Sequence, residues 1–249
     1  MGDLLSCEEI KIMRRIGKIA ARIIKALKRF IKAGISTEDI ELFFKKILKN
    51  YSGYEPAFLG YNGYPASLCV SLNDEIIHGI PKKERKIKEG DLVSVDLGIK
   101  YNGLFVDTAY TYPVGRVSPL AQRLIRVGKK ALKEAIKKVR IGLCVGDIGE
   151  IIEKIAKSNN FSVIRSFVGH GIGHSLHCPP EVPNFGKSGV GEKLSEGMVI
   201  AIEPMISAGT EEVLISSDGW TAKTKDGSLS CHFEHTVAIT KRGPLVITS

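Results

Sequence analysis

The chain contains the same strand-forming motif twice, and this repeat constrains the fold more than any other feature of the sequence. Residues 89–96 and 196–203 both begin with a Glu-Gly turn, continue through an alternating run rich in β-branched residues and end on a carboxylate, Asp96 or Glu203. Glycine permits the backbone geometry of the turn, and alternation places every second side chain on one face. We therefore expect the two acids at equivalent positions on two strands.

Each motif is followed by a returning strand that starts on another acid. Residues 107–115 begin with Asp107, and residues 234–243 begin with Glu234. Each strand pair is therefore predicted to be a hairpin, and two hairpins with one acid on each strand bring four carboxylates together if the repeats pack face to face. An exposed sheet edge is the usual place for such acids. Three of the four, however, lie among Val, Leu, Ile and Phe, and a buried carboxylate needs a cation or hydrogen-bond donors.

Length and composition allow either one large domain or two small ones. The 249 residues are 43% hydrophobic, which is typical of a globular protein, and no apolar run reaches the roughly 18 residues of a membrane span. The N-terminus lacks the pattern of a signal peptide. Five scattered cysteines, an odd number, favour free thiols in a reducing compartment. These features predict a cytoplasmic protein that does not enter a membrane.

Hydrophobic periodicity predicts two helix pairs, each followed by a strand pair. Residues 73–81 are expected to form a loop. This order predicts a duplicated α+β unit that forms a single domain, residues 1–249, with halves of about 1–118 and 119–249. The expected helices span about 8–32, 37–50, 119–140 and 147–158, and further strands are expected at 68–72, near 163 and at 245–247.

A segment rich in glycine and histidine, residues 168–177, is the third signal. It contains His170, His174 and His177. Alternating glycines let the backbone approach a site closely, and histidine is both a metal ligand and a proton donor near neutral pH. The spacing of His170 and His174 alone would permit a zinc pair, but this spacing often occurs by chance.

Four carboxylates with one histidine form a ligand set rich in oxygen and free of thiolate. Such a set suits two divalent ions, because a single ion rarely uses so many anionic groups. Paired ions activate water at neutral pH and polarise a carbonyl group, which is the chemistry of amide hydrolysis. The residues therefore predict a hydrolase, although they do not identify its substrate.

Together the motifs resemble those of the type I methionine aminopeptidases, in their short bacterial form, over nearly the whole chain. This resemblance implies the pita-bread fold, in which a duplicated αβ unit surrounds a curved antiparallel sheet. The motifs are Gly-Tyr-Asn-Gly-Tyr-Pro at 60–65, His-Gly-Ile-Pro at 78–81, Asp96 with Asp107, Gly-His-Gly-Ile-Gly at 169–173, Ile-Glu-Pro at 202–204 and Glu-His-Thr at 234–236.

The resemblance also implies roles for the site residues. Two ions, which could be cobalt, iron, manganese or zinc, would be held by Asp96, Asp107, His170, Glu203 and Glu234. Asp107 and Glu234 would bridge both ions, Asp96 would bind one, and His170 and Glu203 the other. His177 would contact the scissile amide and stabilise the tetrahedral intermediate, and His78 would lie beside the substrate backbone and assist catalysis. Glu203 would carry the proton of the attacking water.

By the same resemblance, the chain would remove N-terminal methionine from nascent chains whose second residue is small. An apolar pocket would hold the methionine side chain. Trp220 could instead be ordinary packing under a loop. The pocket walls would be Tyr61, Tyr64, Cys69 and Trp220, with Phe58 and Leu176 nearby. Leu176 stands where many relatives have an aromatic residue, and the resemblance assigns no role to His174 or Cys178.

Two other classes of protein are compatible with part of this pattern. Prolidases and proline aminopeptidases share this fold and its ligands, but they usually add an N-terminal domain. A binding module without activity should have lost ligands, yet all five are present. The net charge of +9 is concentrated in the first helix, where it is either a solvated face or a surface for RNA, including the ribosome. No direct role with DNA is expected.

Overall fold

The structure, a computed structural model, describes residues 3–249. Met1 and Gly2, which belong to the predicted N-terminal half, lie outside the described residues. None of the described helices is long and apolar enough to cross a membrane. In this described part of the chain the helices are α1 (Cys7–Phe30), α2 (Thr37–Leu48), α3 (Pro119–Lys138) and α4 (Val145–Lys157), and one 3-10 turn, η1, spans Tyr61–Gly63.

Local sequence signals explain where these helices begin. The Ser6 hydroxyl accepts a hydrogen bond from the N–H of Glu9, and the Glu9 carboxylate accepts one from the N–H of Ser6, so a complete capping box starts α1. Ser36 and Asp39 form the same arrangement before α2. Ser118 caps α3, and Pro119 follows it at the first helical position. All four predicted helices are confirmed, with ends within two residues of those expected.

The strands among residues 3–249 form four antiparallel sheets. The first contains β1 (Glu55–Pro56), β2 (Cys69–Leu72), β4 (Leu92–Tyr101) and β5 (Leu104–Pro113). The second contains β6 (Ser162–Val163), β10 (Met205–Ser207) and β13 (Ser230–His232). The third contains β3 (Glu75–Ile77), β11 (Val213–Ile215) and β12 (Ala222–Thr224). The fourth contains β7 (Gly169–Gly171), β8 (Cys178–Val182), β9 (Val199–Ile202), β14 (His235–Thr240) and β15 (Gly243–Val246).

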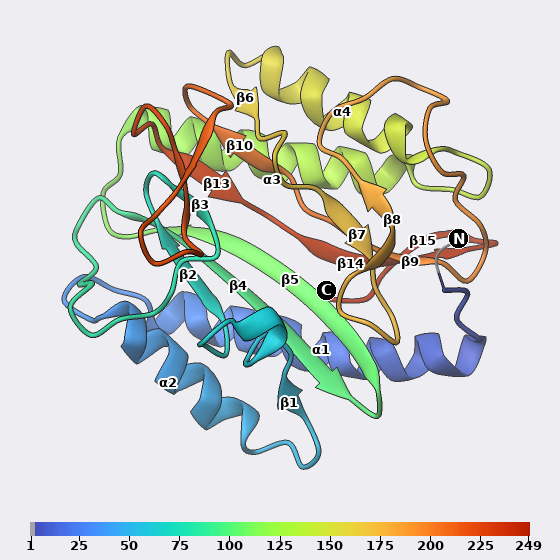
Figure 1. Ribbon diagram of the computed structural model, residues 1–249, viewed down its shortest axis with the longest axis horizontal. Coiled ribbons are helices and arrows are strands. Elements are labelled where there is room, and N and C mark those ends of the chain that lie inside the picture. Colours follow the sequence, from blue (N-terminus) through green and yellow to red (C-terminus); the bar gives the residue numbers. More distant parts are fainter. Residues whose placement is uncertain (1–2) are drawn as a thin grey trace.

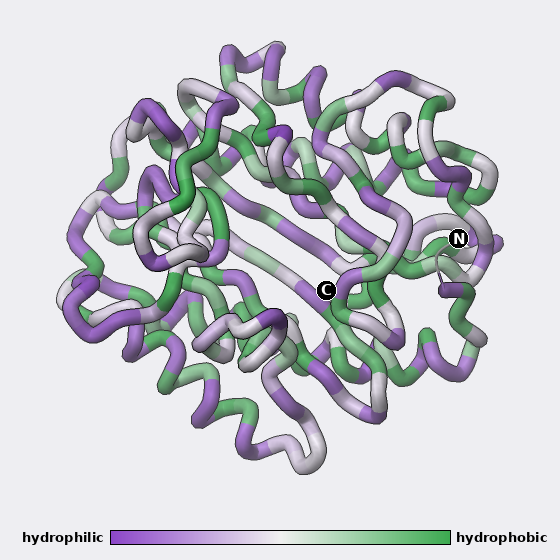
Figure 2. The backbone as a smooth tube through the Cα atoms, in the orientation of Figure 1, coloured by the Kyte–Doolittle hydropathy of each residue, from purple (hydrophilic) through white to green (hydrophobic). Residues whose placement is uncertain are grey.

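The chain order repeats, as predicted. In each half a helix pair precedes a strand pair, α1 and α2 before β4 and β5, and α3 and α4 before β9 and β14. Figure 1 shows α1 and α2 along one side of the sheets and α3 and α4 along the other. Hydrophobic and hydrophilic residues alternate along these helices (Figure 2). The buried residues of each helix are mostly apolar and recur every three or four positions, so each helix packs one apolar face on the core.

Two hydrophobic cores correspond to this repeat. One lies between α1, α2 and the inner faces of β4 and β5, and includes Met13, Phe44 and Val95. The other lies between α3, α4 and the β9 and β14 strands, and includes Leu124 and Ile148. The first core also contains apolar residues from β9, β14 and the last segment of the chain, so the halves pack against each other.

Two predictions about strands were wrong. Residues 73–81, predicted to be a loop, contain β3, which pairs with β12 far along the chain. The second strand pair is not a simple hairpin, because about 30 residues that include β10 to β13 separate Glu203 from Glu234. Its strands nevertheless pair antiparallel, with His235 opposite Ile202. The missing signal in both cases is a pairing between distant segments, which local periodicity does not report.

Candidate metal centre

The β4–β5 pair brings two acids to the same face. Asp96 pairs with Ala109, and Gly98 pairs with Asp107, so the acids lie two positions apart in the ladder. Residues offset by two positions point to the same side of a sheet. Asp107 is buried, Asp96 is partly buried, and no hydrogen bond reaches the buried Oδ1 atom of Asp96 from any described residue.

Glu203 and Glu234 enter from the other half. Glu203 directly follows the last residue of β9, and Glu234 directly precedes β14. Three threonines join β5 to residues 232–236, the segment that includes Glu234. The Thr108 hydroxyl donates to the carbonyl of Glu234 at 2.9 Å, and the Thr236 hydroxyl donates to the carbonyl of Asp107 at 2.7 Å.

Thr111 makes the third link. Its hydroxyl donates to the carbonyl of His232 and accepts from the N–H of the same residue, both at 2.9 Å. Threonine hydroxyls thus join β5 to the segment that includes Glu234, alongside a backbone hydrogen bond of 3.0 Å from the N–H of Glu234 to the carbonyl of Ala109. These bonds fix the carboxylates of the two halves relative to each other.

His170 reaches the acids from β7. Added Cβ atoms on Gly169 and Gly171 would lie 2.3 Å from the carbonyl oxygen of Ala201 and 2.1 Å from that of Pro179, so only glycine fits on either side of His170. The close approach expected of this segment is therefore confirmed. Nδ1 of His170 lies 3.0 Å from the carbonyl oxygen of Gly171, and Nε2 lies 3.6 Å from Oε1 of Glu203.

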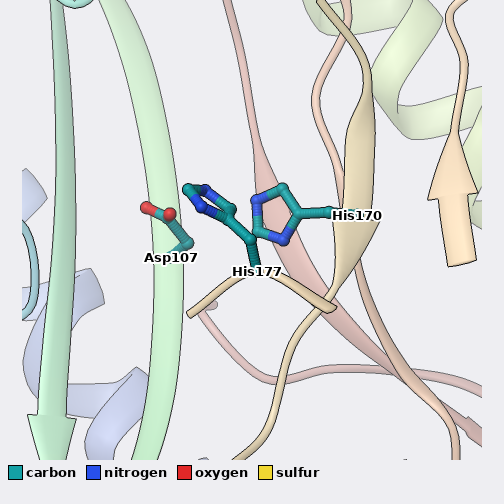
Figure 3. Close-up of side chains that lie close together, drawn as sticks. All are labelled: Asp107, His170 and His177. Carbon is teal, nitrogen blue, oxygen red and sulfur yellow. The ribbon is translucent and has the colours of Figure 1, made fainter. Parts of the chain in front are cut away.

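His177 lies on the loop between β7 and β8, beside His170. Their ring centroids are 4.2 Å apart and the rings are almost perpendicular, and Figure 3 shows both facing Asp107. Nδ1 of His177 lies 3.0 Å from the hydroxyl oxygen of Tyr61. His174 does not join this cluster, because its Nε2 lies 2.9 Å from Oε1 of Glu9 at the start of α1. The pair of His170 and His174 is therefore not a zinc site in this structure.

The predicted ligands form three overlapping groups whose ligand atoms lie within 4.8 Å of one another. The groups share members, so the five residues make one continuous centre, and His177 stands at its edge. The groups are Asp96, Asp107 and Glu234; His170, Glu203 and Glu234; and Asp107, His170 and His177.

The electrostatics of the centre favour a bound cation. Burial raises the pKa of Asp107 to about 7 and that of Glu203 to about 8, and it raises the pKa values of Asp96 and Glu234 well above their ordinary range. The neighbouring carboxylates raise three of these pKa values further. Oε1 of Glu234, like Oδ1 of Asp96, has no hydrogen-bond partner among the described residues. Closely spaced oxygens without donors fit divalent cations.

A cavity of about 590 Å³ opens onto this centre. The predicted pocket residues all line it, and so do Phe167 and Ile77, which sequence reasoning missed. The rings of Tyr64 and Trp220 meet edge to face, with centroids 5.1 Å apart. The Tyr64 hydroxyl donates to backbone carbonyls, which holds this ring in place. The predicted residues that line the cavity are Tyr61, Tyr64, Cys69 and Trp220, with Phe58 and Leu176.

His78 is held at the cavity in an unusual conformation. Its φ is +59°, a left-handed value that is uncommon for a residue with a side chain. Such values persist where the surrounding structure enforces them, and they cluster at functional sites. Its ring meets that of Phe167 edge to face, with centroids 5.6 Å apart. Burial lowers the pKa of His78 to about 4, so its imidazole is neutral at pH 7.

His232 is a buried neighbour of the centre that sequence reasoning did not select. It precedes Glu234 by two residues, and this alternation could have placed both side chains on one face. Nε2 of His232 lies 3.3 Å from Oε2 of Glu203.

Known proteins share both the sequence and the fold. The chain is 48% identical to the methionine aminopeptidase of Aquifex aeolicus, over 99% of this chain and 98% of that protein. The crystal structure of methionine aminopeptidase from Thermotoga maritima matches with a TM-score of 0.98 and 42% identity over 100% of both chains. A prolidase structure from Pyrococcus horikoshii matches less closely, with a TM-score of 0.78 and 25% identity, over 99% of this chain and 63% of that one.

These matches agree with the predicted pita-bread fold, and a family profile locates the relationship in the sequence. Residues 11–241 match the metallopeptidase family M24. The matched region includes every predicted ligand and every predicted wall of the cavity. The chain therefore belongs to metallopeptidase family M24.

Proposed function

We propose that the chain hydrolyses the first peptide bond of substrates that begin with methionine, so that it is a hydrolase with methionyl aminopeptidase activity. The observation that carries this proposal is the juxtaposition of a buried carboxylate and histidine cluster with an apolar cavity of about 590 Å³. Near-complete matches to methionine aminopeptidases support it. The chain works as one catalytic domain, residues 1–249, with halves of about 1–118 and 119–249.

The family implies a divalent metal, and the residues of the centre suit two ions. Cobalt, iron, manganese and zinc all accept mixed carboxylate and imidazole ligands. When bound, such ions polarise a carbonyl group and lower the pKa of water. Asp107 and Glu234 are central in the cluster and suit shared ligands. The ligands are Asp96, Asp107, His170, Glu203 and Glu234.

The remaining polar groups act on the peptide itself. His177 and His78 are neutral at pH 7, because burial lowers the pKa of both side chains. Each ring can therefore donate one N–H group, His177 to the carbonyl oxygen of the scissile amide and His78 to the substrate backbone. Donors fixed in advance around developing negative charge lower the barrier to hydrolysis. Glu203, as a carboxylate beside the cation, accepts the proton of the attacking water and delivers it to the leaving amine.

The cavity walls select methionine. Aromatic rings and a thiol suit a flexible thioether, because sulfur makes favourable contacts with ring edges. Tyr64 and Cys69 are buried, whereas Tyr61 and Trp220 are partly exposed at the entrance. The side chain of the second substrate residue has to fit beside the histidines, which favours small residues there.

The natural substrates are nascent chains in the cytoplasm, and α1 supports an association with the ribosome. Arg14, Arg15, Lys18, Arg22 and Lys25 are all exposed on this helix. A cationic surface of this kind attracts RNA phosphates. Binding to ribosomes that persists unchanged when salt is raised would contradict this electrostatic association.

A panel of peptides tests the proposed activity. Met-Gly and Met-Ala peptides should be cleaved when a divalent metal is present, and Met-Lys and Met-Leu peptides should be poor substrates. The matched control is the same protein after chelation, which should be inactive and should recover with metal. Equal cleavage of X-Pro peptides without preference for methionine would favour the alternative, a prolidase or proline aminopeptidase of the same fold.

Metal analysis completes this test. Protein purified without oxygen and under reducing conditions should contain divalent metal, and its content should fall in parallel with activity during chelation. Activity that survives full removal of the metal would contradict the proposal.

A further inference from the structure

His232 is a buried imidazole that the proposed mechanism does not use. It ends β13, and only 1% of its surface is exposed. Neither of its ring nitrogens has a hydrogen-bond partner in the part of the chain that the structure describes. A buried polar ring without partners costs free energy, so its retention beside a functional centre needs an explanation.

The backbone of His232 is fixed on two sides. It pairs with Met205 in the β10–β13 ladder, and its N–H and carbonyl groups both bond to the Thr111 hydroxyl at 2.9 Å. The Oγ atom of Ser94 lies 2.8 Å from that hydroxyl oxygen. Thr111 is fully buried. The ring is thus presented from a rigid position, and its orientation toward Glu203 does not depend on a mobile loop.

The two carboxylate oxygens of Glu203 face different imidazoles. Oε1 lies 3.6 Å from Nε2 of His170, a proposed metal ligand, whereas Oε2 lies 3.3 Å from Nε2 of His232. A neutral imidazole has one N–H group, and on Nε2 this group would lie beside Oε2 of Glu203. A carboxylate that binds a cation through one oxygen needs a donor for the other.

We propose that His232 is a positioning residue that donates its Nε2–H to Oε2 of Glu203, so that Oε1 faces the cation together with His170. This inference rests on the proposed function, since it takes Glu203 and His170 as ligands. The bond fixes which oxygen of Glu203 faces the metal. It also stops the carboxylate from rotating away when it accepts a proton during hydrolysis.

Two substitutions separate this role from simple packing. His232→Leu fills similar space without a donor, and His232→Gln keeps an N–H group near the same place. Titration calorimetry of the chelated protein with Mn²⁺ should show metal binding about 10- to 100-fold weaker in His232→Leu, with most of the affinity restored in His232→Gln. His174→Gln is the matched control, because His174 is exposed and contacts Glu9 rather than the centre. It should bind Mn²⁺ as the unaltered protein does.

A measurement on the unaltered chain covers the case in which His232→Leu does not fold. In protein labelled with ¹⁵N at histidine and loaded with Zn²⁺, the His232 ring should have a proton on Nε2 and none on Nδ1. The signal that disappears in His232→Gln identifies it. A proton on Nδ1, or a ring nitrogen bound to Zn²⁺, would overturn the proposal.

The outcomes also distinguish this inference from the function on which it rests. If the unaltered protein cleaves methionine peptides with metal and His232→Leu binds Mn²⁺ with unchanged affinity, only the role of His232 is refuted. If the unaltered protein binds no divalent metal, the proposed function itself fails.

Discussion

The two acid-bearing strand pairs differ in regularity although they arise from one repeated motif. In the N-terminal half, β4 and β5 are each 10 residues long and are paired along their whole length. In the C-terminal half, β9 has 4 residues and β14 has 6, and only four positions pair between them. The acids of the first pair lie inside their strands, whereas Glu203 and Glu234 lie just outside theirs.

This difference separates two tasks that the site has to perform. The long β4–β5 hairpin holds Asp96 and Asp107 rigidly, because its two strands are adjacent in the sequence and paired along their whole length. The shorter pair is interrupted by residues 204–233, and this insertion includes Trp220 at the cavity and His232 behind Glu203. One half therefore provides the platform of the centre, and the other provides much of the surface that meets the substrate.

Removal of an acid from the platform should have the largest effect. Asp96→Ala should lower kcat/KM by more than about 100-fold, because it deletes a proposed ligand rather than a group that supports one. The metal content measured after purification should fall first. The metal-free variant should remain folded, because it loses a carboxylate whose buried Oδ1 has no partner. If this variant keeps its full metal content, Asp96 is not a metal ligand.

His177→Ala provides the contrast for Asp96→Ala. It should lower turnover by about 10²- to 10³-fold through the loss of one donor to the developing charge, with metal content nearly unchanged. Metal loss in this variant would mean that His177 is a ligand, an arrangement that its position beside Asp107 and His170 also allows.

Substitutions in residues 204–233, the insertion between β9 and β14, should affect substrate specificity more than the rate of the chemical step. Trp220→Ala should raise KM for methionine peptides about tenfold, since it removes one apolar wall, and should change metal content little. Leu214→Ala, in an exposed residue of the same insertion, is the control. Equal kinetic effects of the two substitutions would mean that Trp220 only supports the fold of the insertion.

Sequence reasoning succeeded where the determining signals are local. Hydrophobic periodicity located the four helices, and alternation located β4 and β5. The five predicted ligands also meet in one cluster. Their individual roles remain predictions.

Features that depend on distant contacts could not be predicted in this way. β3 is a strand of three residues that exists because β12, about 150 residues later, pairs with it. The position of His232 depends on Thr111 and Glu203, which are far from each other in sequence. His174 has the same spacing signal as a ligand, yet its partner is Glu9. Short-range patterns contain no information about such partners.

The smallest expected effect concerns the stability of the metal-free protein. In the folded chain Asp107 and Glu203 hold protons up to about pH 7 and about pH 8, whereas the unfolded chain releases them near their ordinary pKa values of 3.8 and 4.5. Between these limits the folded state binds more protons, so its stability falls as pH rises, by about 1.4 kcal/mol per pH unit for each proton. The buried histidines oppose this trend only below about pH 6.5, where the unfolded chain protonates them.

Thermal unfolding between pH 6.5 and pH 8 tests this comparison of the two halves. With a chelator present, the midpoint should fall by a few degrees as pH rises. With Mn²⁺ present it should not fall, because metal binding requires the deprotonated carboxylates. Asp107→Asn, in the N-terminal strand pair, and Glu203→Gln, just after β9, should each reduce the fall in stability with pH in the presence of chelator. Each substitution removes up to one proton from the difference between the folded and unfolded chain, which is about 1.4 kcal/mol per pH unit. If only one of them does so, the two halves do not share the buried charge, and the centre is not the joint product of both strand pairs.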